Sequence, residues 1–144
     1  MAQVSAPAAS RALPRHGSIL IIEDRTDVRL GVQQLLELSG FHVDGAATAE
    51  QALTRLAAAP RSFALVLLDL RLPGSLSGYE LRARQLADPE LSTVPTVVIT
   101  ACEPQRAERD ALRTDGWLDK PFRADALLEV VKRFVVPDAI GGAA

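Results

Sequence analysis

The sequence predicts an α/β fold, with a five-stranded parallel β-sheet covered by helices on both faces. The first observation is the run Ala64-Leu65-Val66-Leu67-Leu68, which contains no polar residue and ends at Asp69. Such a run is typical of a strand that helices cover on both sides. The second observation is the strict alternation of strand and helix patterns along the chain. This alternation predicts parallel strands joined by right-handed helical crossovers.

The first strand is predicted at Ile19-Leu20-Ile21-Ile22, an apolar run that ends at the carboxylates Glu23 and Asp24. Asp27 is placed to cap the helix that follows, and Gly40 is placed to end it. The apolar residues of this segment recur at helical spacing and so share one face. They are Val28, Val32, Leu35 and Leu36.

The middle of the chain continues the alternation of strands and helices. Phe41-His42-Val43 predicts a short second strand, and the capping-box sequence Thr48-Ala49-Glu50-Gln51 opens a helix that ends at Pro60. The long apolar run is the third strand. After it, Ser77-Gly78-Tyr79-Glu80 forms a second capping box, and its helix ends at Asp88-Pro89. The residues that these two helices should turn inward are Ala52, Leu53, Leu56, Leu81 and Leu86.

The last part of the chain holds the two remaining strand and helix pairs. Val94 to Thr100 predicts a fourth strand. A helix from Glu103 to Thr114 should follow. It should bury little apolar surface, because its one larger apolar residue is Leu112. Trp117-Leu118-Asp119 predicts a short fifth strand before Lys120-Pro121. The final helix has a strongly apolar face: Leu127, Leu128, Val131 and Phe134.

The chain is expected to form one folded domain between two short tails. Residues 1–17 are rich in Ala, Ser and Pro and contain no acidic residue, a composition typical of a disordered tail. They also lack the apolar core of a signal peptide. The domain should span residues 18–136, because Pro137 ends the last helix, and residues 137–144 should form a frayed tail.

Composition limits the classes of partner and compartment. Hydrophobic residues make up 48% of the 144 residues and the formal net charge is −2, so neither nucleic acid nor an anionic membrane is an expected partner. The single cysteine, Cys102, excludes an internal disulfide framework and fits a reducing compartment. No apolar run approaches the roughly 18 residues of a membrane span, and we expect a cytoplasmic protein.

Polar side chains stand where the predicted strands end: Glu23, Asp24, Asp69, Thr100 and Lys120. In open α/β sheets this carboxyl edge is where ligands bind. Three converging carboxylates would repel one another, and Mg²⁺ would remove that repulsion while keeping positions open for phosphate. A hydroxyl and an ammonium group suit phosphoryl oxygens, so the set has what an aspartyl-phosphate needs. Taken alone, Asp69 is equally well interpreted as the cap of the following turn.

Four segments resemble the signature blocks of the receiver domain of two-component response regulators. They are Ile21-Ile22-Glu23-Asp24, Leu67 to Pro73, Val98 to Ala101 and Trp117 to Phe122. The similarity covers about residues 18–135 and is to the stand-alone, single-domain type represented by the chemotaxis receiver. It implies a flavodoxin-like three-layer sandwich with the strand order 2-1-3-4-5.

The resemblance implies a role for each residue at the predicted sheet edge. Asp69 would accept a phosphoryl group from a phosphohistidine on a sensor histidine kinase or a histidine phosphotransfer protein. Mg²⁺ would be bound by Asp24, Asp69 and the backbone carbonyl of Arg71. Glu23, which stands where Asp is commoner, would also contribute to the metal site. Lys120 would pair with the phosphoryl group.

The resemblance also implies a conformational switch in place of classical enzyme activity. Thr100 would hydrogen-bond the phosphoryl group, and Trp117 would turn into the space that Thr100 vacates; Trp117 is equally well interpreted as a core aromatic. The surface of the fourth helix, fifth strand and fifth helix would change and signal to a downstream protein. The Lys120-Pro121 bond is expected to be cis. The protein would be a phosphorelay switch without an output domain, a monomer or weak homodimer, whose own chemistry is limited to self-phosphorylation and autodephosphorylation.

Two segments depart from the usual pattern of the family. The loop at residues 74–77 has one residue more, so its shape over the site should differ. The segment at residues 113–116 is about two residues shorter, which affects the end of the fourth helix. Arg71 is either a solvated loop residue or a group that screens the phosphoryl group. Cys102 is either an inert thiol or a thiol at the mouth of the site.

Three other functions use part of the same residue set. A pseudo-receiver would keep the fold as a phosphorylation-independent interaction module, although the complete set of polar residues argues against it. A hydrolase of the haloacid dehalogenase type also uses an Asp nucleophile with Mg²⁺, but Arg71 stands where that family has a second Asp. A dinucleotide or nucleoside triphosphate site needs a Gly-rich loop after the first strand. The segment Arg25-Thr26-Asp27 contains no glycine.

Overall fold

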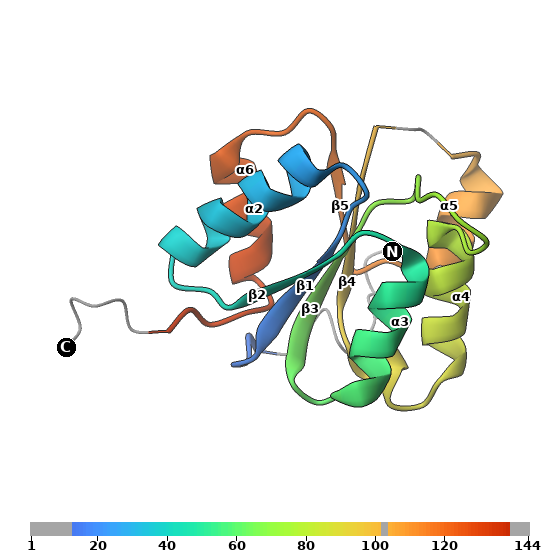
Figure 1. Cartoon of the computed structure of the whole chain (residues 1–144), viewed down its shortest axis with the longest axis horizontal. Helices are drawn as coiled ribbons and strands as arrows, with labels where there is room; N and C mark the ends of the chain where they lie inside the picture. Colours follow the sequence, from blue (N-terminus) through green and yellow to red (C-terminus); the bar gives the residue numbers. More distant parts are fainter. Residues whose placement is uncertain (1–12, 102–103, 139–144) are drawn as a thin grey trace, which may run out of the picture.

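The computed structural model describes residues 13–101 and 104–138 and has the predicted α/β fold. Five parallel strands form one sheet in the order β2-β1-β3-β4-β5 (Figure 1). The strands are β1 (Ser18–Ile22), β2 (Val43–Ala46), β3 (Phe63–Leu68), β4 (Thr96–Thr100) and β5 (Gly116–Asp119). The flavodoxin-like strand order implied by the resemblance is therefore confirmed.

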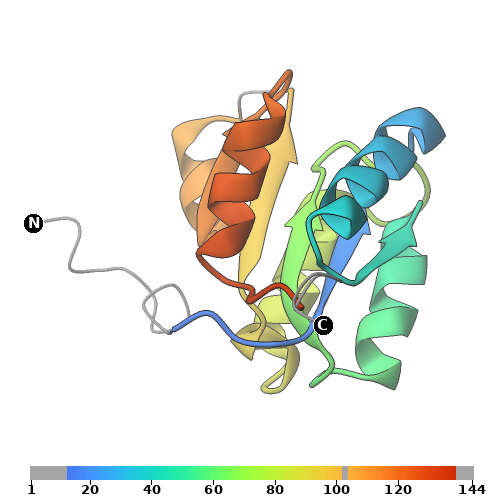
Figure 2. The ribbon, with the colours of Figure 1, turned by 90° about the vertical axis from the view of Figure 1, so that its left-hand side faces the viewer.

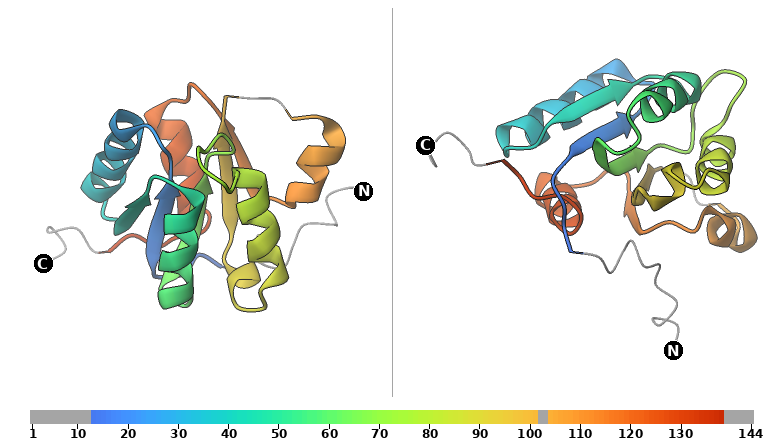
Figure 3. Two further views of the ribbon diagram at one scale, coloured as in Figure 1. Left: turned by 45° about the vertical axis from the view of Figure 1, so that its right-hand side comes forward. Right: turned by 90° about the horizontal axis from the view of Figure 1, so that it is seen from below.

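Helices connect the strands and form a layer on each side of the sheet. They are α2 (Thr26–Leu38), α3 (Ala49–Ala58), α4 (Gly78–Ala87), α5 (Arg106–Leu112) and α6 (Ala124–Lys132), with a 3₁₀ turn, η2 (Leu91–Thr93), before β4. Helices α2 and α6 cover one face, and α3, α4 and α5 cover the other (Figures 1 and 3). Within the described ranges, no helix combines the length and the apolar character that crossing a bilayer requires.

β3 is the central strand, and all six of its residues are buried. Its residues alternate between the two cores, with Leu65 and Leu67 on the α2 side and Val66 and Leu68 on the α3 side. The apolar run is unbroken because neither face of this strand meets water. Ile22 of β1 pairs with Leu68 of β3, so Glu23 and Asp69 leave the sheet beside each other.

α2 begins two residues earlier than its sequence pattern predicts. Its N-cap residue is Arg25, and Asp27 lies inside the first turn. The prediction that Asp27 caps the helix is therefore wrong, although a carboxylate in the first turn still interacts favourably with the helix dipole. Gly40 has a φ of 93° after the helix, as expected for a glycine that ends one.

The second strand lies later in the chain than predicted. β2 begins at Val43 instead of Phe41 and continues through Asp44-Gly45. It pairs in parallel with β1 from Ile19 to Ile22. Pairing with a buried neighbour decides the conformation here and overrides the turn tendency of Asp-Gly. Phe41 is instead buried against the end of α2.

α5 is shorter than predicted and buries a single residue. It spans Arg106–Leu112, and the predicted start at Glu103 lies outside the described residues. Arg113 adopts a left-handed conformation with φ 47°, which ends the helix before Thr114. Leu112 is the one buried residue of this helix. The small burial that its sequence indicates is therefore confirmed, and weak anchoring remains a prediction.

α4 turns two polar side chains into the core that the sequence did not indicate. Arg82 and Gln85 are 3% and 1% exposed. Arg82 donates hydrogen bonds to the carbonyl oxygens of Leu112 (2.8 Å) and Arg113 (2.7 Å) and to Thr96 Oγ1 (3.0 Å). Gln85 Nε2 also donates to Thr96 Oγ1 at 2.9 Å. Because buried polar groups need partners, these contacts tie α4 to the end of α5 and the start of β4.

Segments at both ends of the predicted domain contact it. Arg15 forms an isolated parallel bridge with Val135, and Figure 2 shows the two segments lying side by side. The backbone N–H of Asp138 donates to the Gly40 carbonyl oxygen at 2.8 Å. The side chain of Asp138 also contacts His42. The division into tails at residues 1–17 and 137–144 and a domain at 18–136 remains a prediction.

Candidate functional site

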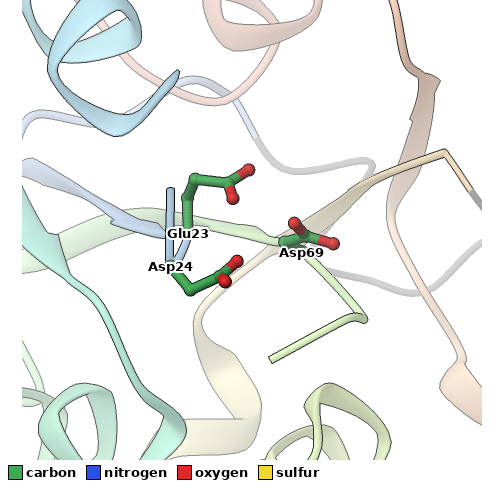
Figure 4. Close-up of side chains that lie close together, drawn as sticks. All are labelled: Glu23, Asp24 and Asp69. Carbon is green, nitrogen blue, oxygen red and sulfur yellow. The ribbon is translucent and has the colours of Figure 1, made fainter. Parts of the chain in front are cut away.

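Three carboxylates meet where β1 and β3 end. One oxygen from each of Glu23, Asp24 and Asp69 lies within 4.8 Å of the others. Figure 4 shows Glu23 and Asp24 extending from the end of β1 toward Asp69. Glu23 and Asp69 are 2% and 5% exposed, whereas Asp24 is exposed. The backbone N–H of Asp69 donates to the Ile22 carbonyl oxygen at 3.1 Å, so parallel pairing itself brings the acidic residues together.

Lys120 supplies a cation to this carboxylate cluster. It follows β5, and the Lys120-Pro121 bond after it is cis, as the resemblance implied. Its Nζ lies 2.5 Å from Glu23 Oε1 and 2.9 Å from Asp69 Oδ2. Burial lowers the pKa of Lys120, but the hydrogen bonds and charges of Glu23 and Asp69 outweigh burial and hold that pKa above its usual value. The ammonium group therefore stays charged at neutral pH.

Thr100 and Arg71 stand at the same edge of the sheet. Thr100 is the last residue of β4, is 1% exposed and pairs with Asp119 of β5. The backbone N–H of Arg71 donates to Asp69 Oδ1 at 3.0 Å, while Arg71 itself is exposed. One oxygen of Asp69 thus faces a backbone N–H and the other an ammonium group, which fixes the carboxylate. Cys102, the other residue predicted near this edge, lies outside the described residues.

Arg29, which the sequence did not indicate, also reaches the site. Its Nη1 donates to the backbone carbonyl oxygen of Glu23 at 2.9 Å. The backbone N–H of Arg25 donates to Glu23 Oε2 at 3.1 Å. Glu23 is therefore held through both its main chain and its side chain. The sequence signal that could have identified this residue is its position near the start of the helix that follows Glu23 and Asp24.

The loop after Asp69 is anchored to α3. Ser75 Oγ donates to Glu50 Oε2 at 2.6 Å, and this hydrogen bond holds the pKa of Glu50 below its usual value. Gly74 has a φ of 100°, which glycine adopts readily. Gly78 opens α4 in close contact with the loop, since a Cβ there would lie 2.6 Å from Leu70 Cα. The segment at 74–77, predicted to be one residue longer than usual, is thus shaped by Glu50, Gly74 and Gly78.

Trp117 of β5 lies against an arginine of α5. The guanidinium carbon of Arg109 is 4.0 Å from the centroid of the indole ring. The indole Nε1 donates to Asp119 Oδ1 at 2.9 Å. Trp117 is half-buried and packs against the core beneath α3, α4 and α5. It therefore connects that core with the exposed surface of α5.

The comparison with protein families agrees with this geometry. The family described as the response regulator receiver domain matches residues 19–132, a range that includes all the site residues named above. The chain belongs to the response regulator receiver family. The acidic cluster at the sheet edge and the cis bond after Lys120 both lie within the matched range.

Curated relatives of this receiver domain include transcriptional regulatory proteins. The C4-dicarboxylate transport transcriptional regulatory protein DctD of Rhizobium meliloti is 38% identical over an alignment of 121 residues that covers 81% of this chain and 25% of that protein. The phosphate regulon transcriptional regulatory protein PhoB of the same species is 34% identical over an alignment of 116 residues that covers 79% of this chain and 50% of that protein. The receiver domain spans a quarter to a half of the length of these relatives.

Solved structures similar to this receiver domain include two from bacterial signalling proteins. The chemotaxis protein CheY4 of Vibrio cholerae has a TM-score of 0.73 at 25% identity, and the similarity covers 86% of this chain and 100% of that chain. The receiver domain of the sensor histidine kinase PA1611 from Pseudomonas aeruginosa has a TM-score of 0.70 at 26% identity, over 85% and 98% of the two chains. That structure is described with a magnesium ion coordinated in its active site cleft.

The donor set of this receiver domain fits a small divalent cation. The carboxylates of Glu23, Asp24 and Asp69 carry a formal charge of −3 and Lys120 carries +1, which leaves −2 at the sheet edge. Mg²⁺ prefers carboxylate and water oxygens and uses few protein ligands. Both the charge and the chemistry of the residues present therefore suit Mg²⁺.

Alkaline pH should destabilise the receiver domain through Lys120. Because its folded pKa lies above the unfolded value of 10.5, its stabilisation is fully present below that pH and is lost as the pH rises through the folded pKa. Urea unfolding between about pH 10 and pH 12 should show a steeper fall for the wild type than for Lys120→Met. Lys132, the other lysine, is exposed, so Lys132→Met is the matched control. Equal slopes in all three proteins would contradict the expectation.

Replacing Arg109 by glutamine should expose one face of the Trp117 ring. The chain has one tryptophan, so its fluorescence reports on this ring alone. We expect emission at longer wavelength, stronger acrylamide quenching and a loss of about 0.5–1 kcal/mol in the free energy of unfolding, the size of an exposed cation–π contact. Arg106→Gln on the same helix is the control, since within the described residues Arg106 has no ring contact. Unchanged emission in Arg109→Gln would refute the stacking.

Proposed function

We propose that this receiver domain accepts a phosphoryl group on Asp69 from a phosphohistidine of a sensor histidine kinase or a histidine phosphotransfer protein. The observation that carries the proposal is the setting of the Asp69 carboxylate. It is buried, with Lys120 Nζ at 2.9 Å from one oxygen and the backbone N–H of Arg71 at 3.0 Å from the other. A fixed, charged nucleophile beside a cation is suited to phosphoryl transfer.

In the proposed transfer, an oxygen of Asp69 forms a bond to phosphorus as the bond from phosphorus to the imidazole nitrogen breaks. The electron pair of that bond leaves with the imidazole, which takes up one proton, and the product is an aspartyl-phosphate. Lys120 would pair with the phosphoryl oxygens, as it now pairs with Glu23 and Asp69. Thr100 would hydrogen-bond one of those oxygens. Phosphoryl transfer depends mainly on positioning of the reacting groups and on stabilisation of the charge on the phosphoryl oxygens, and these side chains would supply both.

Mg²⁺ is the cofactor of this proposal. Glu23, Asp24 and Asp69 would hold it, together with the backbone carbonyl of Arg71. When bound, it would offset the negative charge of the phosphoryl oxygens among three carboxylates. The net charge of −2 at the sheet edge and the magnesium ion described in the PA1611 receiver domain support this cofactor.

The proposed signal is a population shift of the surface formed by α5, β5 and α6. A phosphoryl group adds about −1.5 to −2 charge, which would draw Thr100 toward Asp69 and leave space for Trp117 to turn inward. Two observations support this switch. Arg109 joins Trp117 to α5, and α5 itself is held by one buried residue, Leu112. A downstream protein would recognise the altered surface, with the receiver domain acting as a monomer or weak homodimer.

Intact mass spectrometry after incubation with acetyl phosphate tests the proposed function. With Mg²⁺ the wild type should gain one phosphoryl group, and without Mg²⁺ it should gain little. Hydroxylamine should then remove the group, because an aspartyl-phosphate is a mixed anhydride. No gain under any condition, in a protein that circular dichroism shows to be folded, would favour the alternative of a pseudo-receiver that binds partners without phosphorylation.

A further inference from the structure

We propose that Arg29 is a positioning residue of the metal site, because it fixes the peptide group that orients Asp24. The inference rests on the proposed function and deepens it. Arg29 Nη1 donates to the carbonyl oxygen of Glu23 at 2.9 Å in a partly buried setting. A peptide group is planar, so a fixed Glu23 carbonyl also fixes the nitrogen and Cα of Asp24. The point from which the Asp24 side chain leaves the backbone is thereby set.

Asp24 is the member of the carboxylate cluster that depends most on its backbone. The carboxylates of Glu23 and Asp69 each accept two hydrogen bonds, one of them from Lys120. Asp24 is exposed, and within the described part of the chain no hydrogen bond reaches its carboxylate. Its place beside the other two carboxylates therefore depends on where the main chain holds its Cα.

Both polar backbone atoms of Glu23 are tied to neighbouring elements. Its N–H donates to the carbonyl oxygen of Ala46 in β2 at 3.0 Å, and its carbonyl accepts from Arg29 of α2. β1 ends at Ile22, so this carbonyl lies beyond the strand, and the guanidinium group takes the place of a strand partner. Arg29 thus continues the hydrogen bonding of the sheet by one peptide group beyond β1, as far as the residues that would bind the metal.

Gly45 leaves the space that this arrangement needs. It lies on the edge strand β2 in register with Ile21. A Cβ at position 45 would lie 2.7 Å from Gln33 Oε1 and 3.1 Å from Arg29 Cδ. A side chain at this position would therefore displace the end of Gln33 and shift Arg29 by a few tenths of an ångström. Arg29 thus fits closely against the glycine at position 45 on its course from α2 to the Glu23 carbonyl.

The test is a calorimetric Mg²⁺ titration of the wild type and of matched arginine variants. Arg29→Met should weaken Mg²⁺ binding by about tenfold, the lower end of the loss seen when a group that orients a metal ligand is removed. Arg29→Lys, which keeps a donor and a charge, should recover part of the affinity. Arg25→Met is the control for charge, since it removes an equally charged side chain that pairs with Asp27 in solvent and keeps the backbone N–H that donates to Glu23. It should bind Mg²⁺ as the wild type does.

Two further measurements separate positioning from folding. In Mg²⁺-free protein, the NMR order parameter of the Asp24 amide should fall in Arg29→Met and stay unchanged in Arg25→Met. Gly45→Ala keeps Arg29 but crowds its side chain, so it should weaken Mg²⁺ binding in the same direction. Urea unfolding of each variant confirms that a folded protein is titrated.

The outcomes distinguish this inference from the proposed function. Unchanged Mg²⁺ affinity in Arg29→Met, in a protein whose wild type binds Mg²⁺ and gains a phosphoryl group, overturns the positioning role alone. An equal loss in Arg25→Met also overturns it, because general charge would then explain the effect. A wild type that binds no Mg²⁺ overturns the proposed metal site and this inference together.

Discussion

Asp69→Asn is expected to abolish the gain of a phosphoryl group from acetyl phosphate while the receiver domain stays folded. The lone pairs of a carboxylate attack phosphorus, and an amide is a far weaker nucleophile. Asparagine has nearly the same shape, so its side chain still fits the site at the end of β3. Intact mass after incubation with the donor and Mg²⁺ is the measurement. We expect the mass of the unmodified chain at every donor concentration.

A stability measurement shows whether Asp69→Asn loses phosphorylation because the nucleophile is gone or because the protein is unfolded. Asp69 accepts hydrogen bonds from Arg71 N–H and from Lys120 Nζ, and asparagine has one acceptor oxygen for these two donors. One hydrogen bond is therefore lost, which costs about 0.5–1.5 kcal/mol, and the removal of a negative charge beside Glu23 offsets part of it. The urea midpoint should thus move little. A variant that unfolds in the absence of urea would have to be replaced by Asp69→Ala before the acceptor is judged.

Asp27→Asn is the matched control for this substitution. Its carboxylate lies three residues beyond the cluster, with 71% of the side chain exposed and paired with Arg25. It removes the same charge from the same end of the sheet, so it should gain a phosphoryl group as the wild type does. A hydroxylamine-labile phosphoryl group on Asp69→Asn would mean that another carboxylate is the acceptor. Glu23 and Asp24 would then be the first to examine.

Local sequence patterns predicted the strands and the residues at their ends. The apolar run before Asp69 indicates a strand buried on both faces, and Ser77 with Glu80 forms the predicted capping box at the start of α4. The carboxyl ends of parallel strands share one edge, so the order of elements was enough to expect Asp24, Asp69 and Lys120 near one another. These features depend on residues close together in the chain or on a general rule of topology.

Contacts between distant segments could not be predicted in the same way. β2 runs through Asp44-Gly45, which locally favours a turn, because β1 offers a partner along its whole length. Arg29 and Arg82 have the sequence character of surface arginines on amphipathic helices. Their partners lie in other elements, and the hydrogen bond from Arg82 to Leu112 spans 30 residues. Hydrophobic periodicity cannot identify an arginine whose burial depends on such partners.

Replacing Arg82 by methionine should destabilise the receiver domain by about 3–5 kcal/mol, because three acceptors lose a donor and each buried acceptor left unsatisfied costs about 1–3 kcal/mol. Methionine keeps the apolar stem and fills much of the volume. It leaves the carbonyl oxygens of Leu112 and Arg113 without the donors that now cap the end of α5. Thr96 Oγ1 also loses a donor. Urea unfolding followed by circular dichroism measures the change.

Arg84→Met is the matched control for this prediction. Arg84 is exposed on the same helix, two residues further along the chain. Substitution there should change the free energy of unfolding by no more than about 0.5 kcal/mol. Hydrogen exchange adds a local readout, because the amides of α5 should lose protection in Arg82→Met before those of β3. Similar stabilities of the two variants would mean that water replaces the guanidinium group at little cost.

The pH dependence of the Arg82→Met effect can identify its electrostatic part. Burial raises the pKa of Asp115, while the hydrogen bond from Thr96 N–H and the charge of Arg82 lower it again. Without Arg82 the pKa of Asp115 should rise further, so the folded variant prefers a protonated Asp115. Its deficit in stability should then be smaller near pH 4.5 than at pH 7, since stability linked to a raised carboxyl pKa is lost as the pH rises through it.

If the loss of stability in Arg82→Met is equal at both pH values, the whole effect comes from the hydrogen bonds that Arg82 donates to the carbonyl oxygens at the end of α5. In either case Arg82 holds the C-terminal end of this helix to α4. Leu112, the one buried residue of α5, lies at that same end. A movement of α5 during signalling would therefore pivot about the end near Leu112. The largest displacement would occur at the opposite end, near Arg106, where α5 follows β4 and the buried Thr100.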